Sequence, residues 1–328
     1  MHDSVTAIDP RVRTVTLAGG DTISFDAAVL ATGAAPRRLE IPGADLSGVH
    51  DLRTVEDSVR LHDAIRIASR VAVIGGGWIG SEVAASARQM GAEVVIIEQA
   101  PLPLLRVLGS EIGKVFRDLH ADHGVELRFE RGVVGLRGAG RVEAVELDDG
   151  RFEVADVVVV GVGVIPRTQL AVDAGLAVDD GVVVDEHLQS AVRAIYAAGD
   201  VANAWHPHYG RRLRVEHWAN ALHQGSTAGR NAAGDRASYT RLPYFFSDQY
   251  DLGMEYVGYG DANDEVTVRG DLASREFIAF WHRDGAVTAA MNVNVWDVVD
   301  DLRAIVEAPG PVDPARLADP EVPLTELR

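Results

Sequence analysis

Short, continuous apolar runs separated by amphipathic segments organise the first two thirds of the chain. Such runs are typical of parallel strands that are buried on both faces. They are found at residues 27–31, 71–74, 93–97 and 157–162. Helices are expected between and after these runs, at residues 57–69, 81–90, 110–123 and 217–233. The pattern therefore predicts an α/β protein built on parallel sheets.

The two ends of the chain have a different texture. Near the N-terminus, two alternating segments flank a turn at residues 19–21 and predict a hairpin. Further alternating strands are expected at 126–130, 132–136, 142–147, 255–259, 266–269, 276–282 and 287–295. A helix is expected at 296–307 with Trp296 on its apolar face, and the Pro-rich tail after it is expected to be loosely held.

Length and charge narrow the class of protein. A chain of 328 residues is long enough for two or three domains. Its net charge of -18 argues against nucleic acid or an anionic membrane as the main partner. The absence of cysteine from the sequence excludes disulfides, thiolate metal sites and cysteine nucleophiles within it. The apolar runs are too short to span a bilayer, and a cytoplasmic location is expected.

The sharpest chemical signal is the segment VAVIGGGWIG at residues 71–80, followed by Glu98 at the end of the next apolar run. Gly75 permits a tight turn, Gly77 lets the backbone approach a pyrophosphate, and Gly80 allows close packing of helix on strand. The helix N-terminus then offers N–H groups and its positive dipole to the phosphates. The Glu98 carboxylate would accept both ribose hydroxyls and repel a 2′-phosphate, which favours NAD over NADP. The alternative is a glycine-rich turn without a ligand.

Two other strand ends, Thr32-Gly33 and Gly199-Asp200, flank this dinucleotide unit in the sequence. Small residues after a strand let the backbone approach a flat ligand, and Asp200 can accept a hydrogen bond from a polyol. Taken alone, each junction is more often an ordinary turn.

No metal site is predicted, although two groups of residues include metal-ligand types. The histidines lack a carboxylate or thiol set to complete a ligand shell. They are His206, His208, His217 and His223. The spacing of Asp297, Asp300 and Asp301 suits a solvated helix face better than a calcium site.

The order of motifs is more specific than any one of them. The motifs are VLATG at 29–33, GGGWIG at 75–80, GVGVIP at 161–166, IYAAGDV at 195–201, VEHWANA at 215–221, LPYFFSDQYD at 242–251 and NVNVW at 292–296. This series resembles the FAD-dependent NADH:ferredoxin reductases, the putidaredoxin-reductase-like branch of the glutathione-reductase superfamily. The last two motifs are similar to that branch's C-terminal domain.

The resemblance implies a fold class and a domain order. The fold is α/β, with a Rossmann-like NAD domain inserted in a partial FAD domain, plus a C-terminal α+β domain. The implied domains are residues 1–53 for the first part of the FAD-binding domain, 54–172 for the NAD-binding domain, 173–239 for the second FAD-binding part, and 240–328 for the C-terminal reductase domain. FAD and NAD are the implied cofactors.

The resemblance also implies which residues bind the two cofactors. For NADH they are Gly75, Gly77, Ile79, Gly80 and Glu98, with Gly161, Val162 and Gly163 on the nicotinamide side. For FAD they are Thr32, Gly33, Gly199 and Asp200 at the flavin and its ribityl chain, and Glu216, His217 and Trp218 under the isoalloxazine.

Two side chains are implied to lie beside the reacting rings. Glu82 matches a family acid near the nicotinamide carboxamide. Phe246 resembles the aromatic residue that covers the flavin, where many relatives have Trp. The residues alone leave an alternative for each: Glu82 as a solvated first-turn residue favoured by the helix dipole, and Phe246 as a buried core residue.

The activity implied by the resemblance is hydride transfer from NADH to the flavin, followed by single-electron transfers to a two-iron ferredoxin. That ferredoxin would serve a monooxygenase or a ring-hydroxylating dioxygenase. Ferredoxins are usually acidic, so docking on this acidic chain requires a local basic patch. The candidates are Arg211, Arg212, Arg214 and Arg230, and solvated surface arginines are the alternative.

The chain departs from the family in one respect. Relatives carry two glycine fingerprints, of which the first binds the ADP half of FAD, and this sequence has only one. The first βαβ unit of the flavin domain is therefore expected to be absent. Three hypotheses follow: a reductase whose given start is internal, a flavin-free or weakly flavin-binding NAD-binding protein, and one half of a split reductase.

Overall fold

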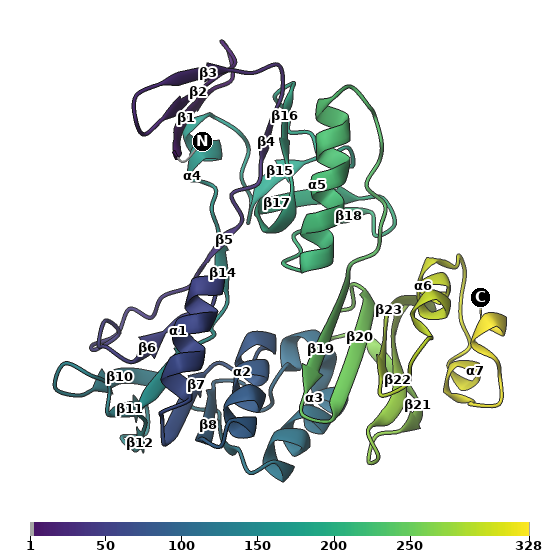
Figure 1. Cartoon of the computed structure of the whole chain (residues 1–328). Helices are drawn as coiled ribbons and strands as arrows, with labels where there is room; N and C mark the ends of the chain where they lie inside the picture. Colours follow the sequence, from purple (N-terminus) through teal and green to yellow (C-terminus); the bar gives the residue numbers. More distant parts are fainter. Residues whose placement is uncertain (1–2, 328) are drawn as a thin grey trace. The chain divides into compact units, whose positions relative to one another are not determined.

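The computed structural model describes residues 3–327, which belong to two compact units (Figure 1). Unit 1 consists of Met1–Ala35 and Ile165–Phe245. Unit 2 consists of Pro36–Val164 and Phe246–Arg328. Within the described part of the chain, no helix combines the length and the apolar character that crossing a membrane requires.

The centre of unit 2 is a five-stranded parallel sheet with helices on one face. Its strands, in spatial order, are β6 (Val49–His50), β13 (Val157–Val160), β7 (Arg70–Ile74), β8 (Glu93–Glu98) and β9 (Glu126–Phe129). Its helices are α1 (Val55–Ile65), α2 (Trp78–Gln89) and α3 (Leu105–Asp122). The predicted parallel strands at 71–74, 93–97 and 157–162 are thereby confirmed.

Burial on both faces explains why the apolar runs are continuous. In β7, Val71 and Val73 pack with apolar residues of α1 and α2, whereas Ala72 and Ile74 pack on the opposite face. That face is covered by a small antiparallel sheet. Its strands are β10 (Val133–Arg137), β11 (Ala144–Leu147) and β12 (Phe152–Val154). A side chain on either face of β7 is therefore removed from water, which leaves no polar alternation to detect.

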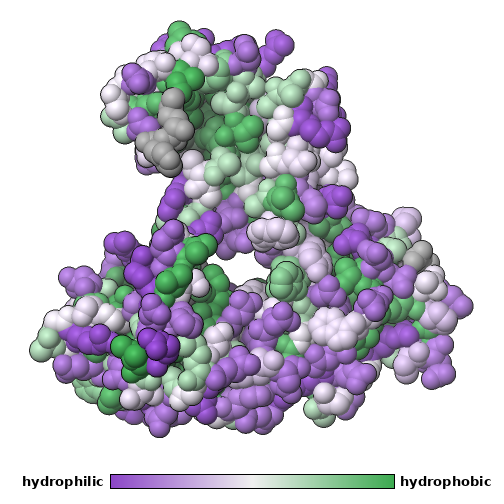
Figure 2. All heavy atoms as spheres, viewed as in Figure 1, coloured by the Kyte–Doolittle hydropathy of each residue, from purple (hydrophilic) through white to green (hydrophobic). Residues whose placement is uncertain are grey.

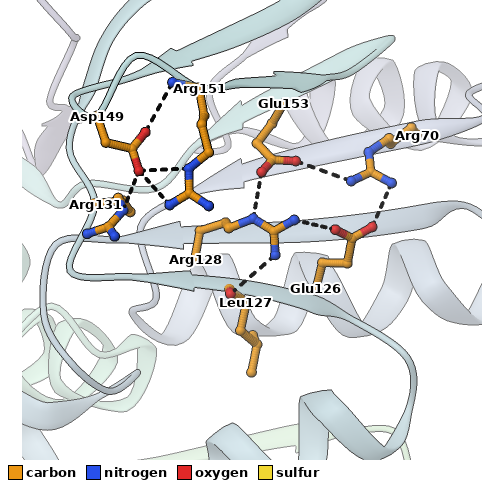
Figure 3. Close-up of polar contacts among 8 residues, drawn as sticks. All are labelled: Arg70, Glu126, Leu127, Arg128, Arg131, Asp149, Arg151 and Glu153. Carbon is orange, nitrogen blue, oxygen red and sulfur yellow. Dashed lines mark hydrogen bonds and ion pairs between the residues drawn. The ribbon is translucent and has the colours of Figure 1, made fainter.

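Ion pairs link strands β7, β9 and β12 of unit 2 (Figure 3). Arg70 lies 2.8 Å from Glu126 and 3.3 Å from Glu153. Arg128 contacts the same two carboxylates, each at 2.5 Å. Because both arginines share both acids, removal of one guanidinium leaves each carboxylate with one remaining partner.

Unit 1 is a set of small sheets around one core. The predicted N-terminal hairpin is confirmed, and a strand that the sequence analysis missed, β1, joins it. The elements are β1 (Val5–Asp9), β2 (Thr14–Leu17), β3 (Thr22–Ser24), β4 (Ala28–Leu30), α4 (Gln169–Asp173), β15 (Val182–Val184), β16 (Ile195–Ala197), the 3-10 turn η1 (Gly199–Val201), β17 (Ala202–His206), β18 (Arg211–Leu213) and α5 (Trp218–Ala232). β4 pairs in parallel with β16, and β15 pairs in parallel with β17. Two short strands, β5 (Ala34–Pro36) and β14 (Val164–Pro166), form a separate ladder.

The C-terminal part of unit 2 is a five-stranded antiparallel sheet. Its order is β19 (Tyr244–Gln249), β20 (Leu252–Gly258), β23 (Ala286–Val293), β22 (Glu276–Arg283) and β21 (Glu265–Asp271). Helix α6 (Val299–Glu307) packs on β23 and β20. Short α7 (Pro314–Ala318) packs on β21, and a last 3-10 turn, η2, spans Leu324–Glu326.

Two expectations about the C-terminal end were wrong. The helix begins at Val299, so Trp296 precedes it and is 55% exposed instead of lying on an apolar face. The tail is also not loosely held, because Leu317 is fully buried and Arg269 donates hydrogen bonds to the carbonyls of Pro320 and Val322. A Pro-rich composition disfavours regular structure, but one buried leucine and one arginine are enough to attach the segment.

Three helices begin earlier than the pattern predicted. Helix α1 starts after Thr54, whose side chain forms a capping box with Asp57. Helix α2 starts at Trp78, inside the glycine segment, and α3 starts at Leu105 with a kink at Gly109.

Figure 2 shows hydrophilic residues over much of the visible face of unit 2, which agrees with an acidic protein in which 24% of residues are charged.

Candidate functional site

The glycine turn between β7 and α2 leaves no room for side chains at two of its positions. Gly75 has a φ of +106°, and a Cβ there would lie 2.4 Å from the carbonyl oxygen of Gly161. A Cβ on Gly80 would lie 2.0 Å from the carbonyl oxygen of Gly75. Both contacts are with backbone, which cannot move aside without moving a strand. The close helix-strand packing expected at Gly80 is therefore present, and Gly75 adds a close approach to the next strand end.

Gly77 differs from Gly75 and Gly80, because a Cβ there would meet no protein atom within 4 Å. This residue is the N-cap of α2 and has no capping side chain, so the first N–H groups of the helix receive no side-chain cap at that position. The open space at Gly77 thus lies where the N–H groups and the dipole of α2 attract an anion. This arrangement fits the pyrophosphate of a dinucleotide.

Glu98 holds the glycine turn from the end of β8. Its Oε2 accepts a hydrogen bond of 2.7 Å from the N–H of Gly76, and its Oε1 accepts one of 2.8 Å from the N–H of Ala100. The carboxylate is therefore fixed in orientation before any ligand is present. Each oxygen keeps a further lone pair for a ribose hydroxyl.

These groups line one cavity of about 490 Å³, a suitable volume for part of a dinucleotide. The cavity is bordered by the glycine turn, Glu98 and the second strand end at Gly161, Val162 and Gly163. Three arginines that the sequence analysis missed also line it: Arg37, Arg106 and Arg131. They come from three separate segments, so only the folded chain brings them together. They place positive charge beside the site expected for the phosphates.

Ile79 is 42% exposed at the start of α2, and its role in NADH binding stays a prediction. The predicted roles of Gly161, Val162 and Gly163 on the nicotinamide side are also untested. The N–H of Gly161 donates a hydrogen bond of 2.8 Å to the carbonyl of Ile74, which keeps this strand end against the glycine turn.

Glu82 is not a solvated first-turn residue. Because α2 begins at Trp78, Glu82 is its fifth residue, and its side chain is partly buried. Its Oε1 accepts a hydrogen bond of 2.7 Å from the hydroxyl of Ser247 on β19. Burial raises the pKa of the Glu82 carboxyl, the bond from Ser247 opposes this effect, and the negative charge of Asp248 adds to it.

The strand-to-turn junctions of unit 1 adopt conformations that favour glycine. Gly33 has a φ of +66° and Gly199 a φ of +76°. The Thr32 hydroxyl donates a hydrogen bond to the carbonyl of Arg167, and the N–H of Gly199 donates one to the side chain of Gln224. β4 and β16 are adjacent parallel strands, so their carboxyl ends, and with them Thr32 and Gly199, lie at the same edge of the sheet. That edge is where flat ligands bind in such sheets.

The start of α5 supplies an imidazole whose Nδ1 is buried. His217 is the N-cap of α5, and its Nδ1 is buried without a hydrogen-bond partner among the described residues. Burial lowers the pKa of His217 to about 4, so the ring is neutral at pH 7. An unsatisfied buried nitrogen is costly unless a ligand pairs with it. This orphan nitrogen and the two glycine junctions fit a flavin at unit 1.

The neighbours of His217 differ from it in exposure. Trp218 begins α5 and is 76% exposed, whereas Asp200 is buried in η1. Glu216 accepts a hydrogen bond of 2.6 Å from Arg214. The flavin-binding roles of these residues stay predictions.

Phe246 is 59% exposed, so the alternative of a buried core residue was wrong. It lines a second cavity of about 510 Å³ in the C-terminal part of unit 2, together with exposed Trp296. The same cavity is lined by the carboxylates of Asp248, Glu255, Asp297 and Asp300. Exposure is the property that an aromatic residue needs to contact a ligand ring, and the predicted contact with a flavin remains untested.

The four candidate docking arginines of unit 1 are not equally available. Arg214 is largely buried and contacts Asp180 at 3.1 Å and Glu216 at 2.6 Å. Arg212 donates hydrogen bonds to the backbone carbonyls of Val184 and Asn203. Arg230 pairs with Asp235, but its side chain is 65% exposed, and Arg211 is also exposed. Arg211, Arg212 and Arg230 are therefore exposed, whereas Arg214 is not.

Two family profiles match consecutive parts of the chain. The sequence profile of the family described as pyridine nucleotide-disulphide oxidoreductase matches residues 1–225. A second profile, described as reductase C-terminal, matches residues 244–328.

Individual relatives match along nearly the whole chain. The anthranilate 1,2-dioxygenase system ferredoxin--NAD(+) reductase component of Burkholderia cepacia is 39% identical over 98% of this chain and 79% of its own. Putidaredoxin reductase of Pseudomonas putida is 35% identical over 98% of this chain and 78% of its own. Among solved structures, the ferredoxin reductase for the CYP199A2 system from Rhodopseudomonas palustris has a TM-score of 0.95 at 36% identity, covering 99% of this chain and 81% of that one.

Proposed function

The chain belongs to the pyridine nucleotide-disulphide oxidoreductase family, and we propose that it passes electrons from NADH through FAD to a two-iron ferredoxin of an oxygenase system. The observation that carries this proposal is the cavity at the glycine turn, where an uncapped helix N-terminus, the open Gly77 and the oriented Glu98 together suit NADH. The choice of ferredoxin as acceptor is supported by the named activities of the relatives and by the C-terminal domain that this chain shares with them.

Each cofactor has its own set of residues. NADH would be held by Gly75, Gly77, Ile79 and Gly80 at its pyrophosphate and by Glu98 at its ribose. FAD would be held by the two junctions at Thr32-Gly33 and Gly199-Asp200 and by the start of α5 at Glu216, His217 and Trp218. Bound FAD would supply what side chains lack, namely acceptance of a hydride and release of electrons one at a time.

The residues of the chain bind and orient, and they determine the charge around the reacting rings. The backbone N–H groups at the start of α2 would neutralise the pyrophosphate, and Glu98 would exclude a 2′-phosphate by charge repulsion. Glu82 would place a carboxylate near the nicotinamide, and Phe246 would shield the flavin from water. His217 is neutral at pH 7, so it adds no charge to the flavin site.

The ferredoxin would dock through basic side chains, for which Arg211, Arg212 and Arg230 are the exposed candidates and Arg214 is the least exposed one. The acidic protein as a whole repels an acidic partner, so association should depend on this local charge and on salt. Because NADH is available in the cytoplasm, we propose that the protein works there.

The test starts from purified protein incubated with FAD and passed over a desalting column. We expect retained flavin absorbance, bleaching of that absorbance by NADH under anaerobic conditions, and spectral reduction of an added two-iron ferredoxin of a ring-hydroxylating dioxygenase. Gly77→Ala is the comparison variant, because it should keep the fold and need at least about tenfold more NADH for the same bleaching. Protein that binds NADH but retains no FAD would contradict the proposal and favour a flavin-free NAD-binding protein.

A further inference from the structure

A buried row of hydrogen-bonded side chains leads away from Glu82 through unit 2. The Ser247 hydroxyl contacts Glu82 at 2.7 Å, and the Gln249 amide nitrogen contacts Ser247 Oγ at 3.1 Å. Gln249 Oε1 lies 3.1 Å from His120 Nε2, and His120 Nδ1 lies 3.3 Å from the Tyr250 hydroxyl. Ser247, Gln249 and His120 are each no more than 2% exposed. The row joins α2, β19 and α3, and is called here the Glu82 chain.

The donors in the Glu82 chain have only one consistent direction. An ionised Glu82 can only accept hydrogen bonds, so the Ser247 hydroxyl must donate a hydrogen bond to Glu82. A lone pair of the Ser247 oxygen then accepts a hydrogen bond from the amide nitrogen of Gln249. The amide oxygen of Gln249 then accepts from His120, which fixes the proton of that ring on Nε2. Nδ1 of His120 is left as the acceptor for the Tyr250 hydroxyl. Every donor in the chain therefore points toward Glu82.

The far end of the chain is held by stacking. The ring of His123 lies parallel to that of Tyr250, at 7° and with centroids 3.7 Å apart. His123 Nδ1 bonds to the carbonyl of Leu119 in the preceding turn of α3, and its Nε2 lies 3.6 Å from Asp251. These contacts limit rotation of Tyr250, and they lie on the side of the chain that is farthest from Glu82.

The Glu82 chain orients the charge of the Glu82 carboxylate and does not conduct a proton. Relay of a proton along hydrogen bonds needs groups that gain and lose one readily, and the amide of Gln249 in the middle of the row does not. Burial lowers the pKa of His120 to about 4, so this ring also stays neutral at pH 7. The groups between Glu82 and Tyr250 thus act as fixed dipoles.

We propose that Ser247, Gln249 and His120 are positioning residues that act through Glu82, holding its carboxylate in one orientation and in its ionised form beside the nicotinamide. The consequence for hydride transfer rests on the proposed function. As a hydride leaves NADH, the nicotinamide ring gains positive charge, and a fixed carboxylate nearby stabilises that charge. Asp248, the other acid that acts on Glu82, favours protonation, and the Glu82 chain opposes it.

The first experiment measures ionisation of Glu82 without any cofactor. The midpoint of urea unfolding is measured against pH for two pairs of proteins. The first pair is wild type and Glu82→Gln, and the second is Ser247→Ala and the double variant Ser247→Ala/Glu82→Gln. The difference within each pair gives the contribution of Glu82. The folded pKa of Glu82 is raised above its ordinary value of 4.5, so its contribution to stability is present at low pH and is lost as pH rises through the folded pKa. In Ser247→Ala we expect this loss about one pH unit higher, because one hydrogen bond to the charged form is gone.

Matched variants separate the hydrogen bond from general packing. Ser247→Thr keeps the hydroxyl and should restore the wild-type titration, and Ser86→Ala, at an exposed serine of the same helix, should leave it unchanged. Gln249→Met, of similar volume, should shift the loss upward by a smaller amount. An unchanged Glu82 titration in Ser247→Ala overturns the proposal. A shift in Ser247→Ala with none in Gln249→Met removes Gln249 and His120 from it.

The second experiment measures flavin reduction by NADH in a stopped-flow instrument from low to neutral pH. The rate should fall as Glu82 is protonated, and this fall should occur about one pH unit higher in Ser247→Ala, with little change in the concentration of NADH that gives half the maximal rate. If the folding titration shifts and the rate profile does not, the Glu82 chain stands and its link to hydride transfer is overturned. If FAD is not bound, the first experiment still decides the positioning role.

Discussion

Two regions of helix α2 are built in opposite ways: the glycine turn at its start, and Glu82 in its second turn. At its N-terminus the site is a backbone turn whose glycines all lie in one short segment, residues 75–80. Four residues later, Glu82 depends on side chains from Ser247 onward, 165 positions away in the sequence. At Gly75 and Gly80 the backbone site has no room for an added atom, whereas the row of side chains is expected to weaken by degrees. The predictions below test this difference.

The largest effect is expected from Gly80→Ala. The new Cβ would lie 2.0 Å from the carbonyl oxygen of Gly75, and neither strand nor helix can shift without breaking the close packing of the turn. We expect a loss of more than about 3 kcal/mol in the free energy of unfolding, measured by urea denaturation. A variant as stable as wild type would show that the turn can relax, and would contradict the claim that the backbone at Gly80 has no room for a side chain.

Gly77→Ala is the control for that experiment, because its Cβ would meet no protein atom within 4 Å. We expect stability within about 0.5 kcal/mol of wild type, as for an ordinary surface substitution. Binding of NADH, measured by quenching of tryptophan fluorescence, should nevertheless weaken by at least about tenfold, because the methyl group occupies space at the helix N-terminus. Equal affinity in the two proteins would place the pyrophosphate elsewhere.

A second side-chain network tests how far gradual weakening extends. Arg70→Met should destabilise unit 2 by about 2 kcal/mol, because Glu126 and Glu153 lose one of their two arginines but keep Arg128. The value is below that of a fully buried pair, since Glu126 is 42% exposed and screened by water. Urea midpoints in low and high salt give the measurement, and the loss should shrink at high salt.

Acid should weaken the Glu82 chain through His120. The pKa of His120 is lowered to about 4 in the folded protein from an ordinary value of 6.5, chiefly by burial. The unfolded chain therefore binds the proton more readily, and stability is lost as pH falls from about 6.5 toward 4. Between pH 7 and pH 5 we expect a loss on the order of 2 kcal/mol from this residue.

The comparison of wild type with His120→Asn isolates this contribution. His217 in unit 1 also has a pKa lowered to about 4, so it adds a loss of the same sign that both proteins share. The pH dependence of the urea midpoint should be weaker in the variant. The same pH dependence in both would show that His120 is hydrated or already charged, and would contradict the donor direction assigned to the chain.

The same contrast explains what the sequence could predict. The glycine turn, the strands around it and Glu98 were predicted because their constraints are local: a short apolar run, glycines, and an acid at a set distance. The start of α2 was missed by three residues, because Trp78 to Gly80 form its first turn although glycine disfavours helix. Trp296 was placed on a helix for its periodicity, but the chain there turns before the helix begins.

Side-chain contacts between distant segments carried no such signal. The serine at 247 was visible within a motif, but nothing in its spacing connects it with Glu82 or His120. Arg37, Arg106 and Arg131 reach one cavity from three segments, and each is an ordinary surface residue when considered alone. The solvated-residue alternative for Glu82 and the buried alternative for Phe246 were both wrong for this reason, since exposure depends on which segments fold against each residue.

Glu98 combines a side-chain contact with the backbone site, because its carboxylate accepts a hydrogen bond from the N–H of Gly76 in the glycine turn. Glu98→Gln keeps one oxygen, but its NH₂ group would face the N–H of Gly76 or Ala100. We expect about 1 kcal/mol less stability and roughly tenfold weaker binding of NADH. Loss of the negative charge should also raise the affinity for NADPH relative to NADH. Fluorescence titrations with both nucleotides measure this ratio, and unchanged affinity for NADH would mean that the glycine backbone alone forms the site.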